Sequence, residues 1–157
     1  MNYSQNCIGL IKQFEGCRLT PYKDAAGFLT VGYGHRTNSP NPITQVQAEY
    51  LLQSDTAKAA VIVNEYCHGE LPADLNQNQF DALASMAFNL GRAPFMNTDG
   101  TKTHLYQCLL AGDEPGAAGH ILDFDHAGGN MLPGLFRRRQ AEQHLFTERI
   151  HSIPVAA

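Results

Sequence analysis

The sequence predicts a mostly helical α+β fold, in which one small antiparallel sheet is joined to a larger group of helices. Short β-like pieces, broken by proline, aspartate and glycine, fill residues 17–36. A long helix is expected from residue 44 to about residue 66. A later helix that starts after Asn76 is apolar on nearly every side, which is typical of a buried central helix.

The first expected helix ends at an acid. Ser4 can act as its N-cap, and Gly16 is a natural stop just after Glu15. Apolar residues recur between them at helical spacing: Cys7, Ile8, Ile11 and Phe14. Glu15 is therefore expected at a rigid helix end beside apolar neighbours, although a solvated helix-end glutamate is the simpler interpretation of this residue alone.

The next stretch is expected to form hairpins that carry a second acid and a hydroxyl. Asp24 lies in a turn, where aspartate commonly bonds its own backbone. Thr30 opens an alternating run over residues 30–34. Gly32 and Gly34 weaken a strand, so the backbone there is expected to bend or to be approached closely by another group.

Capping boxes mark the two main helices of the remaining chain, at Thr44-x-x-Gln47 and Asn76-x-x-Gln79. Residues 92–102 form an expected loop, Thr103 caps the next helix, and helices follow at about 103–111, at about 114–124 and up to about residue 146. We predict one domain over 1–157, with a small N-terminal lobe at about 14–43, a connecting helix at about 44–66 and a helical lobe at about 67–157.

Composition limits the classes of partner. The formal net charge of -4 disfavours nucleic acid, which binds basic surfaces. No apolar run approaches the roughly 18 residues of a membrane span, and residues 1–6 lack the basic and apolar segments of a signal peptide. We therefore expect a monomer that is made in the cytoplasm and does not span a membrane.

No metal, cofactor or disulfide pattern stands out. The four cysteines show no CxxC spacing, so free thiols are favoured over a disulfide framework; they are Cys7, Cys17, Cys67 and Cys108. The segment 123–126 holds potential metal ligands, but nothing else in the sequence groups with it, which favours a solvated helix end. The arginines at 137–139 are expected to provide surface charge, with one of them at the interface between the lobes.

Glu15, Asp24 and Thr30 follow one another with eight and then five intervening residues. Two carboxyls on separate short elements can act as proton donor and water activator, and a hydroxyl can orient the water. This combination suits hydrolysis of a glycosidic bond. A sugar chain lying against the strand would be one reason for Gly32 and Gly34.

The three residues are embedded in F-E-G…P-Y-K-D-A-A-G-F-L-T-V-G-Y-G-H, which resembles the catalytic signature of the bacteriophage lysozyme (endolysin) family, glycoside hydrolase family 24. Blocks at 79–91 and 127–142 extend the match to about residues 8–146, close to the lambdoid-phage endolysins. The resemblance implies a two-lobed lysozyme-like fold with the first helix packed on the C-terminal lobe. It also implies a muramidase that hydrolyses the β-1,4 bond between N-acetylmuramic acid and N-acetylglucosamine in bacterial peptidoglycan.

The resemblance further implies roles for single residues. Glu15 would protonate the leaving oxygen, and Asp24 would activate water with inversion, helped by Thr30. Inversion requires carboxyls about 6.5–9.5 Å apart and retention about 5–5.5 Å, so the sequence leaves the stereochemical outcome open.

Three supporting positions also match the family. His35 corresponds to a histidine near the active site that is not assigned the chemistry, and a structural histidine is the alternative. Asn89 corresponds to a position near the cleft floor, where a helix cap is the alternative. Arg138 is the preferred partner for the glutamate among three consecutive arginines. Residues 97–102 are extra loop residues that depart from the family pattern. They affect the contacts of that loop and not the predicted chemistry.

Two alternatives remain at this point. A lytic transglycosylase would act on the same polysaccharide without needing the second acid, and a catalytically inactive wall-binding or structural module would not need either. The biological setting is open between a phage endolysin released through a holin and an antibacterial effector delivered by a secretion apparatus.

Overall fold

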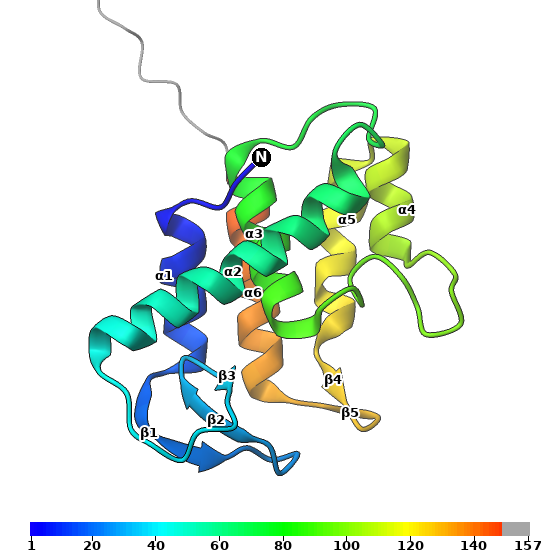
Figure 1. Cartoon of the computed structure of the whole chain (residues 1–157). Helices are drawn as coiled ribbons and strands as arrows, with labels where there is room; N and C mark the ends of the chain where they lie inside the picture. Colours follow the sequence, from blue (N-terminus) through cyan, green and yellow to red (C-terminus); the bar gives the residue numbers. More distant parts are fainter. Residues whose placement is uncertain (149–157) are drawn as a thin grey trace, which may run out of the picture.

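The computed structural model describes residues 1–148, and these form six α-helices, one 3₁₀ helix and two small antiparallel sheets. Figure 1 shows the larger sheet at one end of the long helix α2, with the other helices gathered around α3 and α6. The prediction of a mostly helical α+β, lysozyme-like fold is confirmed.

Helix α1 (Gln5–Glu15) begins and ends as the sequence predicts. The Ser4 side chain accepts a hydrogen bond from the Asn6 amide, and the Ser4 amide donates to Asp81 of α3 over 2.9 Å. Cys7, Ile8 and Ile11 are buried, because their face of the helix packs on α3. Glu15 is thus the last residue of a helix that is anchored at its start.

The larger sheet has the order β1-β2-β3, formed by β1 (Arg18–Lys23), β2 (Leu29–Gly32) and β3 (His35–Arg36). Tyr22 pairs with Thr30, and Val31 pairs with His35. The register between β1 and β2 shifts after Arg18, which gives β1 a bulge. Two tight turns, at residues 24–28 and 33–34, connect the strands.

Helix α2 (Gln45–Cys67) begins with the predicted Thr44–Gln47 capping box and ends one residue beyond the expected end. It leaves the sheet and runs along the helical part of the molecule (Figure 1). Helix α3 (Gln77–Leu90) also starts with its predicted box, and its residues 78–87 are all buried. It packs against α1, α2 and α6, as expected of a central helix.

The remaining elements are α4 (His104–Ala111), α5 (Glu114–His120), the 3₁₀ helix η1 (Ile121–Phe124), β4 (His126–Ala127), β5 (Asn130–Met131) and α6 (Pro133–Thr147). Thr103 caps α4 as predicted. The expectation of one helix over 114–124 was wrong, because the chain tightens into 3₁₀ geometry from Ile121 onward. The sequence analysis also missed the short β4–β5 hairpin.

All four cysteines are unpaired, as predicted. Burial raises the pKa of the Cys67 thiol to about 12, and it raises the pKa of Cys7 still further. Both thiols therefore remain protonated and pack as small apolar groups.

Candidate active site

Glu15 is held by an arginine from the other end of the chain. Its Oε1 accepts a hydrogen bond from Nη1 of Arg138 over 2.5 Å. The Arg138 side chain is 5% exposed and that of Glu15 is 21% exposed, so the pair faces the surface only on the glutamate side. The sequence predicted only apolar neighbours for Glu15. The structure adds a charged neighbour, Arg138.

A buried charge network supports this arginine from behind. Arg138 Nε also donates to Glu142 Oε1 over 3.2 Å, and Arg139 Nε lies 2.8 Å from Glu142 Oε2. Ser85 of α3 donates to the same Glu142 over 2.7 Å. Burial raises the pKa of Glu142 and lowers that of Arg139, while the attraction between the two groups opposes both shifts.

The network corrects one prediction and adds residues that the sequence analysis missed. Arg138 and Arg139 are buried, so the arginine run is not a surface patch; only Arg137 is exposed. The spacing of both buried arginines from Glu142, three and four residues along α6, was the one signal that could have identified the network.

Asp24 is held by its own turn. Its Oδ1 accepts hydrogen bonds from the amides of Ala26 and Phe28 at 2.9 and 2.8 Å. The Asp24 carbonyl accepts from Gly27 over 2.9 Å. Within residues 1–148, no hydrogen bond is made to the second carboxylate oxygen, which leaves that atom free to bind a water molecule.

Thr30 is connected to the same turn through Phe28. Its hydroxyl donates to the Phe28 carbonyl over 3.1 Å, while the Phe28 amide donates to Asp24. Thr30 is 3% exposed, yet it lines the same cleft as the two acids. Because the hydroxyl hydrogen of Thr30 is used in this bond, the hydroxyl oxygen can interact with another group only as a hydrogen-bond acceptor.

Gly34 explains how the sheet can lie so close to Glu15. It lies in the turn between β2 and β3 with a φ of +88°, and a Cβ atom built on it would lie 3.4 Å from Oε2 of Glu15. A side chain at this position would be strained by the positive φ, and its Cβ atom would be in van der Waals contact with the carboxylate. The group that approaches Gly34 closely is therefore Glu15, whereas an added Cβ on Gly32 would lie 3.4 Å from the Cβ of Ala48. A sugar chain against this strand stays a prediction.

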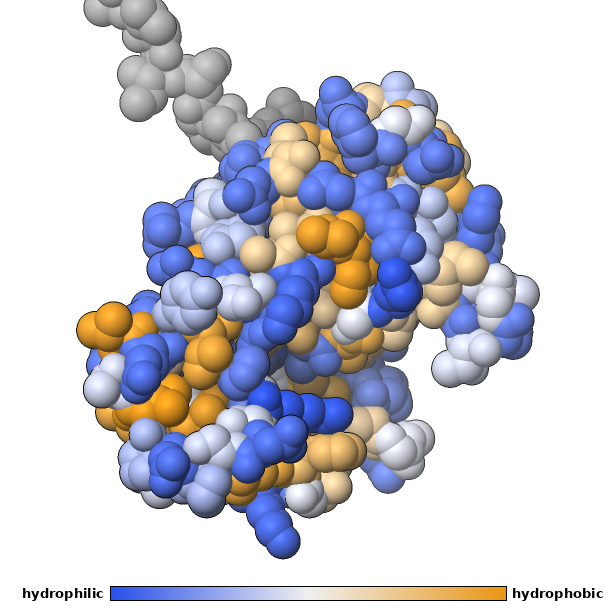
Figure 2. Space-filling model, viewed as in Figure 1, coloured by the Kyte–Doolittle hydropathy of each residue, from blue (hydrophilic) through white to orange (hydrophobic). Residues whose placement is uncertain are grey.

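Glu15, Asp24 and Thr30 line one cleft of about 610 Å³. The surface is hollowed between the sheet-bearing part and the helical part, and Figure 2 shows many hydrophilic side chains around the hollow. His35 also lines the cleft, and its Nδ1 lies 2.7 Å from Oδ2 of Asp55, which in turn pairs with Lys58. Sequence reasoning missed this pair.

Glu15 also lines a second groove of about 810 Å³. It is lined by the start of α6, and it shares only Glu15 and Asn89 with the cleft. Asn89 accepts a hydrogen bond from Arg139 over 2.9 Å, and the amide of Gly91 caps α3. Asn89 therefore lies between the two grooves, and the alternative of Asn89 as the helix cap is wrong.

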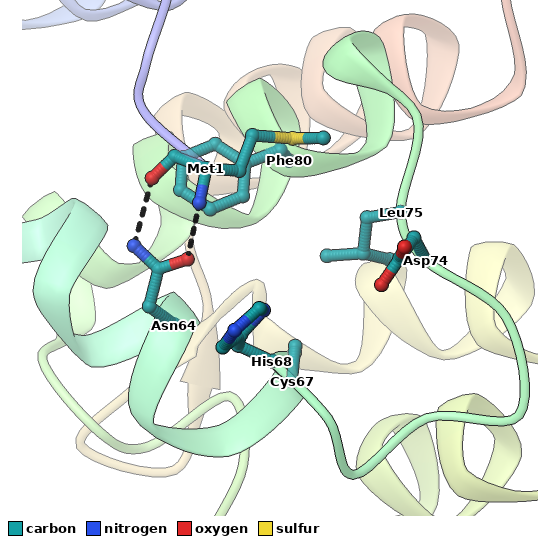
Figure 3. Close-up of a pocket in the computed structure, with 7 residues that line it drawn as sticks. All are labelled: Met1, Asn64, Cys67, His68, Asp74, Leu75 and Phe80. Atoms are coloured by element: carbon teal, nitrogen blue, oxygen red, sulfur yellow. Dashed lines mark hydrogen bonds between the residues drawn. The ribbon is translucent and has the colours of Figure 1, made fainter.

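A smaller pocket of about 280 Å³ lies away from these residues, between the C-terminal end of α2 and the start of α3. Figure 3 shows Asn64 hydrogen-bonded to the backbone nitrogen and to the carbonyl oxygen of Met1. Cys67 and Phe80 also line this pocket. Its lining holds no pair of acids, so it offers none of the acid–base chemistry of the cleft.

Two carboxyls that face one cleft beside a small sheet, on a lysozyme-like fold, define a glycosidase of the lysozyme type. The comparisons with known proteins agree with this class. The chain belongs to the phage lysozyme family, whose model matches residues 12–142.

Similar proteins include two phage endolysins and one muramidase domain. The chain is 39% identical to an endolysin of Acyrthosiphon pisum secondary endosymbiont phage 1 over 93% of its own length and 98% of the relative's. It is 39% identical to an endolysin of Lactococcus phage c2 over 97% of its length, but spans only 63% of that protein. The muramidase domain of SpmX from Asticaccaulis excentricus has the same fold, with a TM-score of 0.80, 30% identity and coverage of 94% and 99%.

These matches confirm the predicted family and the predicted enzyme class, a peptidoglycan-degrading lysozyme. Within residues 1–148, no helix has both the length and the apolarity needed to cross a membrane.

Proposed function

We propose that this lysozyme is a muramidase in which Glu15 is the general acid and Asp24 the general base. Its substrate is the β-1,4 bond between N-acetylmuramic acid and N-acetylglucosamine. The observation that supports this most strongly is that Glu15 lies between two grooves. A polysaccharide needs room on both sides of the bond that is cut, and the acid must reach the oxygen at the junction.

Arg138 gives Glu15 a fixed orientation toward this junction, because it binds one carboxylate oxygen and leaves the other near Gly34. The positive charge of Arg138 is shared with Glu142. In the reaction Glu15 donates its proton to the leaving oxygen and becomes a carboxylate, which the guanidinium then stabilises.

Asp24 acts on the attacking water molecule. Its Oδ1 is occupied by two amides, so Oδ2 receives a proton from the attacking water. Thr30 orients this water, and the negative charge of Asp24 stabilises the oxocarbenium-like transition state. We propose inversion at the anomeric carbon. A first product with the α configuration supports it, and a first β product contradicts it.

The direct test is digestion of purified peptidoglycan by the wild type and by Glu15→Gln, with products identified by mass spectrometry. Reducing-end muropeptides from the wild type and no turnover by the variant are expected, because glutamine keeps the shape but supplies no proton. Glu70→Gln, an exposed change outside both grooves, is the control and keeps full activity.

Other outcomes separate the alternatives. Anhydro-muramyl products would identify a lytic transglycosylase, and wall binding by both proteins without sugar release would identify a binding module. Thr30→Ala is expected to lose less activity than Glu15→Gln; equal losses would give Thr30 a more direct role.

We also propose that the chain acts on the wall as a monomer, binds no nucleic acid, and is made in the host cytoplasm and delivered by a holin or a secretion apparatus. The endolysin relatives favour the holin. Lysis of expressing cells only when a holin is co-expressed supports this route. Lysis without one contradicts it, and an inhibitor gene beside this one would favour the effector.

A further inference from the structure

Two histidines and an aspartate from three separate elements meet on the helical part of the molecule. His104 is the first residue of α4, His120 the last residue of α5, and Asp123 lies in η1. One potential ligand atom from each lies within 4.8 Å of the other two. The sequence analysis found no residues that group with Asp123, and this interpretation was wrong. His120 lies three residues before Asp123, at the end of α5, whereas His104 is distant in the sequence and comes close only because α4 packs on α5 and η1 packs next to α5.

The donor atoms suit a transition metal. Imidazole nitrogens and a carboxylate oxygen are common ligands of Zn²⁺, which binds them at about 2.0–2.2 Å. Donors on one tetrahedral ion lie about 3.3–3.5 Å apart at such bond lengths, so three atoms that lie within 4.8 Å of one another can reach this spacing by small side-chain movements. Ca²⁺ and Mg²⁺ prefer oxygen ligands and fit the set poorly.

The side chains have freedom for this movement, while their backbone is fixed. His104 and Asp123 are exposed and His120 is half-buried. The imidazole rings lie 5.2 Å apart and are tilted by 49°, and Nδ1 of His120 already contacts Asp123 over 2.7 Å.

Buried neighbouring residues fix the backbone of the elements that carry the three ligands. Thr103, directly before His104, caps α4 and donates to the Pro94 carbonyl. Ala117 and Ile121 on either side of His120 are fully buried. Because the backbone of these elements is already ordered, only side-chain entropy is lost when the three groups bind an ion.

We propose that His104, His120 and Asp123 bind one Zn²⁺ ion, with water at the remaining position. The ion would connect α4 to the α5–η1 segment. The three residues line neither groove around Glu15, so the ion would act as a structural cross-link and hydrolysis would not require it. This inference is independent of the proposed catalytic mechanism.

The test is a calorimetric titration of chelator-treated protein with ZnCl₂ at pH 7.5. We expect one equivalent and a micromolar or tighter dissociation constant, and no heat with MgCl₂. His120→Ala should weaken binding more than about 100-fold, because the loss of a group that only orients a ligand already costs about 10–100-fold. Asp123→Asn should weaken it less than His120→Ala does.

His68→Ala removes an exposed histidine elsewhere and is the matched control. Should His120→Ala unfold, His104→Gln at the exposed start of α4 tests the same site. Free Zn²⁺ at about 100 times its dissociation constant should raise the melting temperature by roughly 5–10 °C in the wild type and in His68→Ala.

Affinity should fall between pH 7.5 and 5.5, because only neutral imidazole binds the metal. A millimolar constant, more than one equivalent, or unchanged binding by both His120→Ala and His104→Gln would overturn the proposal.

Discussion

The two acids of the cleft are held in opposite ways. Asp24 is fixed by amides two and four residues further along its own turn. Glu15 is fixed by Arg138, which is 123 residues away in the chain and rests on a buried glutamate. The turn is exposed, whereas the network beneath Glu15 is among the most buried parts of the molecule.

The comparison shows which part of the molecule fixes the position of each carboxylate. A turn can position Asp24 without help from the rest of the fold, so it tolerates changes elsewhere. The position of Glu15 depends on α1, α3 and α6 packing correctly together. Removing the charge of Asp24 should therefore affect activity, whereas removing the charge of Glu142, in the network beneath Glu15, should affect stability.

After the loss of turnover expected from Glu15→Gln, the next largest effect is expected from Asp24→Asn. Asparagine keeps the oxygen that accepts from Ala26 and Phe28, so the fold should remain and stability should change by less than about 1 kcal/mol. Turnover should fall by about 10²–10⁴-fold, because the base is lost. Measurement of kcat on purified peptidoglycan, with circular dichroism as the folding control, checks this; near-normal turnover would limit Asp24 to a structural role.

Glu142→Gln should have the opposite profile. It leaves the guanidinium groups of Arg138 and Arg139 buried without their shared carboxylate, which is expected to lower the free energy of unfolding by about 3–5 kcal/mol. Urea denaturation measures it. The exposed control Glu70→Gln should change stability by no more than about 0.5 kcal/mol; equal effects of the two changes would mean that the network adds no stability.

Arg138→Lys sharpens the comparison at Glu15. Lysine keeps the charge, but its single ammonium cannot reproduce the fork that contacts both Glu15 and Glu142. A displaced acid should lower kcat by up to about 10²-fold while KM changes less. Arg137→Lys, at the exposed neighbour, is the control; if both variants match the wild type, Arg138 does not position Glu15.

The smallest effect is expected in the turn that holds Asp24. Gly27 has a φ of +85°, and nothing lies within 4 Å of an added Cβ atom. Gly27→Ala should therefore cost about 1 kcal/mol through backbone strain alone. Gly9→Ala, in α1 and equally free of neighbours, should instead stabilise by about 0.5–1 kcal/mol. Thermal denaturation of the pair checks these opposite signs.

Local signals predicted most of the fold. Ser4, Thr44, Asn76 and Thr103 each cap the helix that the sequence assigned to them, because a cap depends only on the next two or three residues. The division of residues 114–124 into α5 and η1 was missed, since a turn can tighten without any change in its apolar pattern.

The site residues, too, divide into those that local sequence signals identify and those that only the packed fold identifies. The spacing of Glu15, Asp24 and Thr30 is local, and the sequence alone selected them as candidates. Which arginine contacts Glu15, what supports it and which histidines join Asp123 depend on helix rotation and packing. Three consecutive arginines look equivalent in a sequence, and only their positions around α6 distinguish them.

The sequence by itself determined the helix caps, the hairpins of residues 17–36 and the order of acid, acid and hydroxyl, because each of these depends only on residues that are close together in the chain. The tertiary structure decided that two arginines turn inward to share Glu142, that Gly34 lies against Glu15, and that Glu15 separates two grooves. Those outcomes require burial of charge against charge, and only the packed fold can bring such distant partners together.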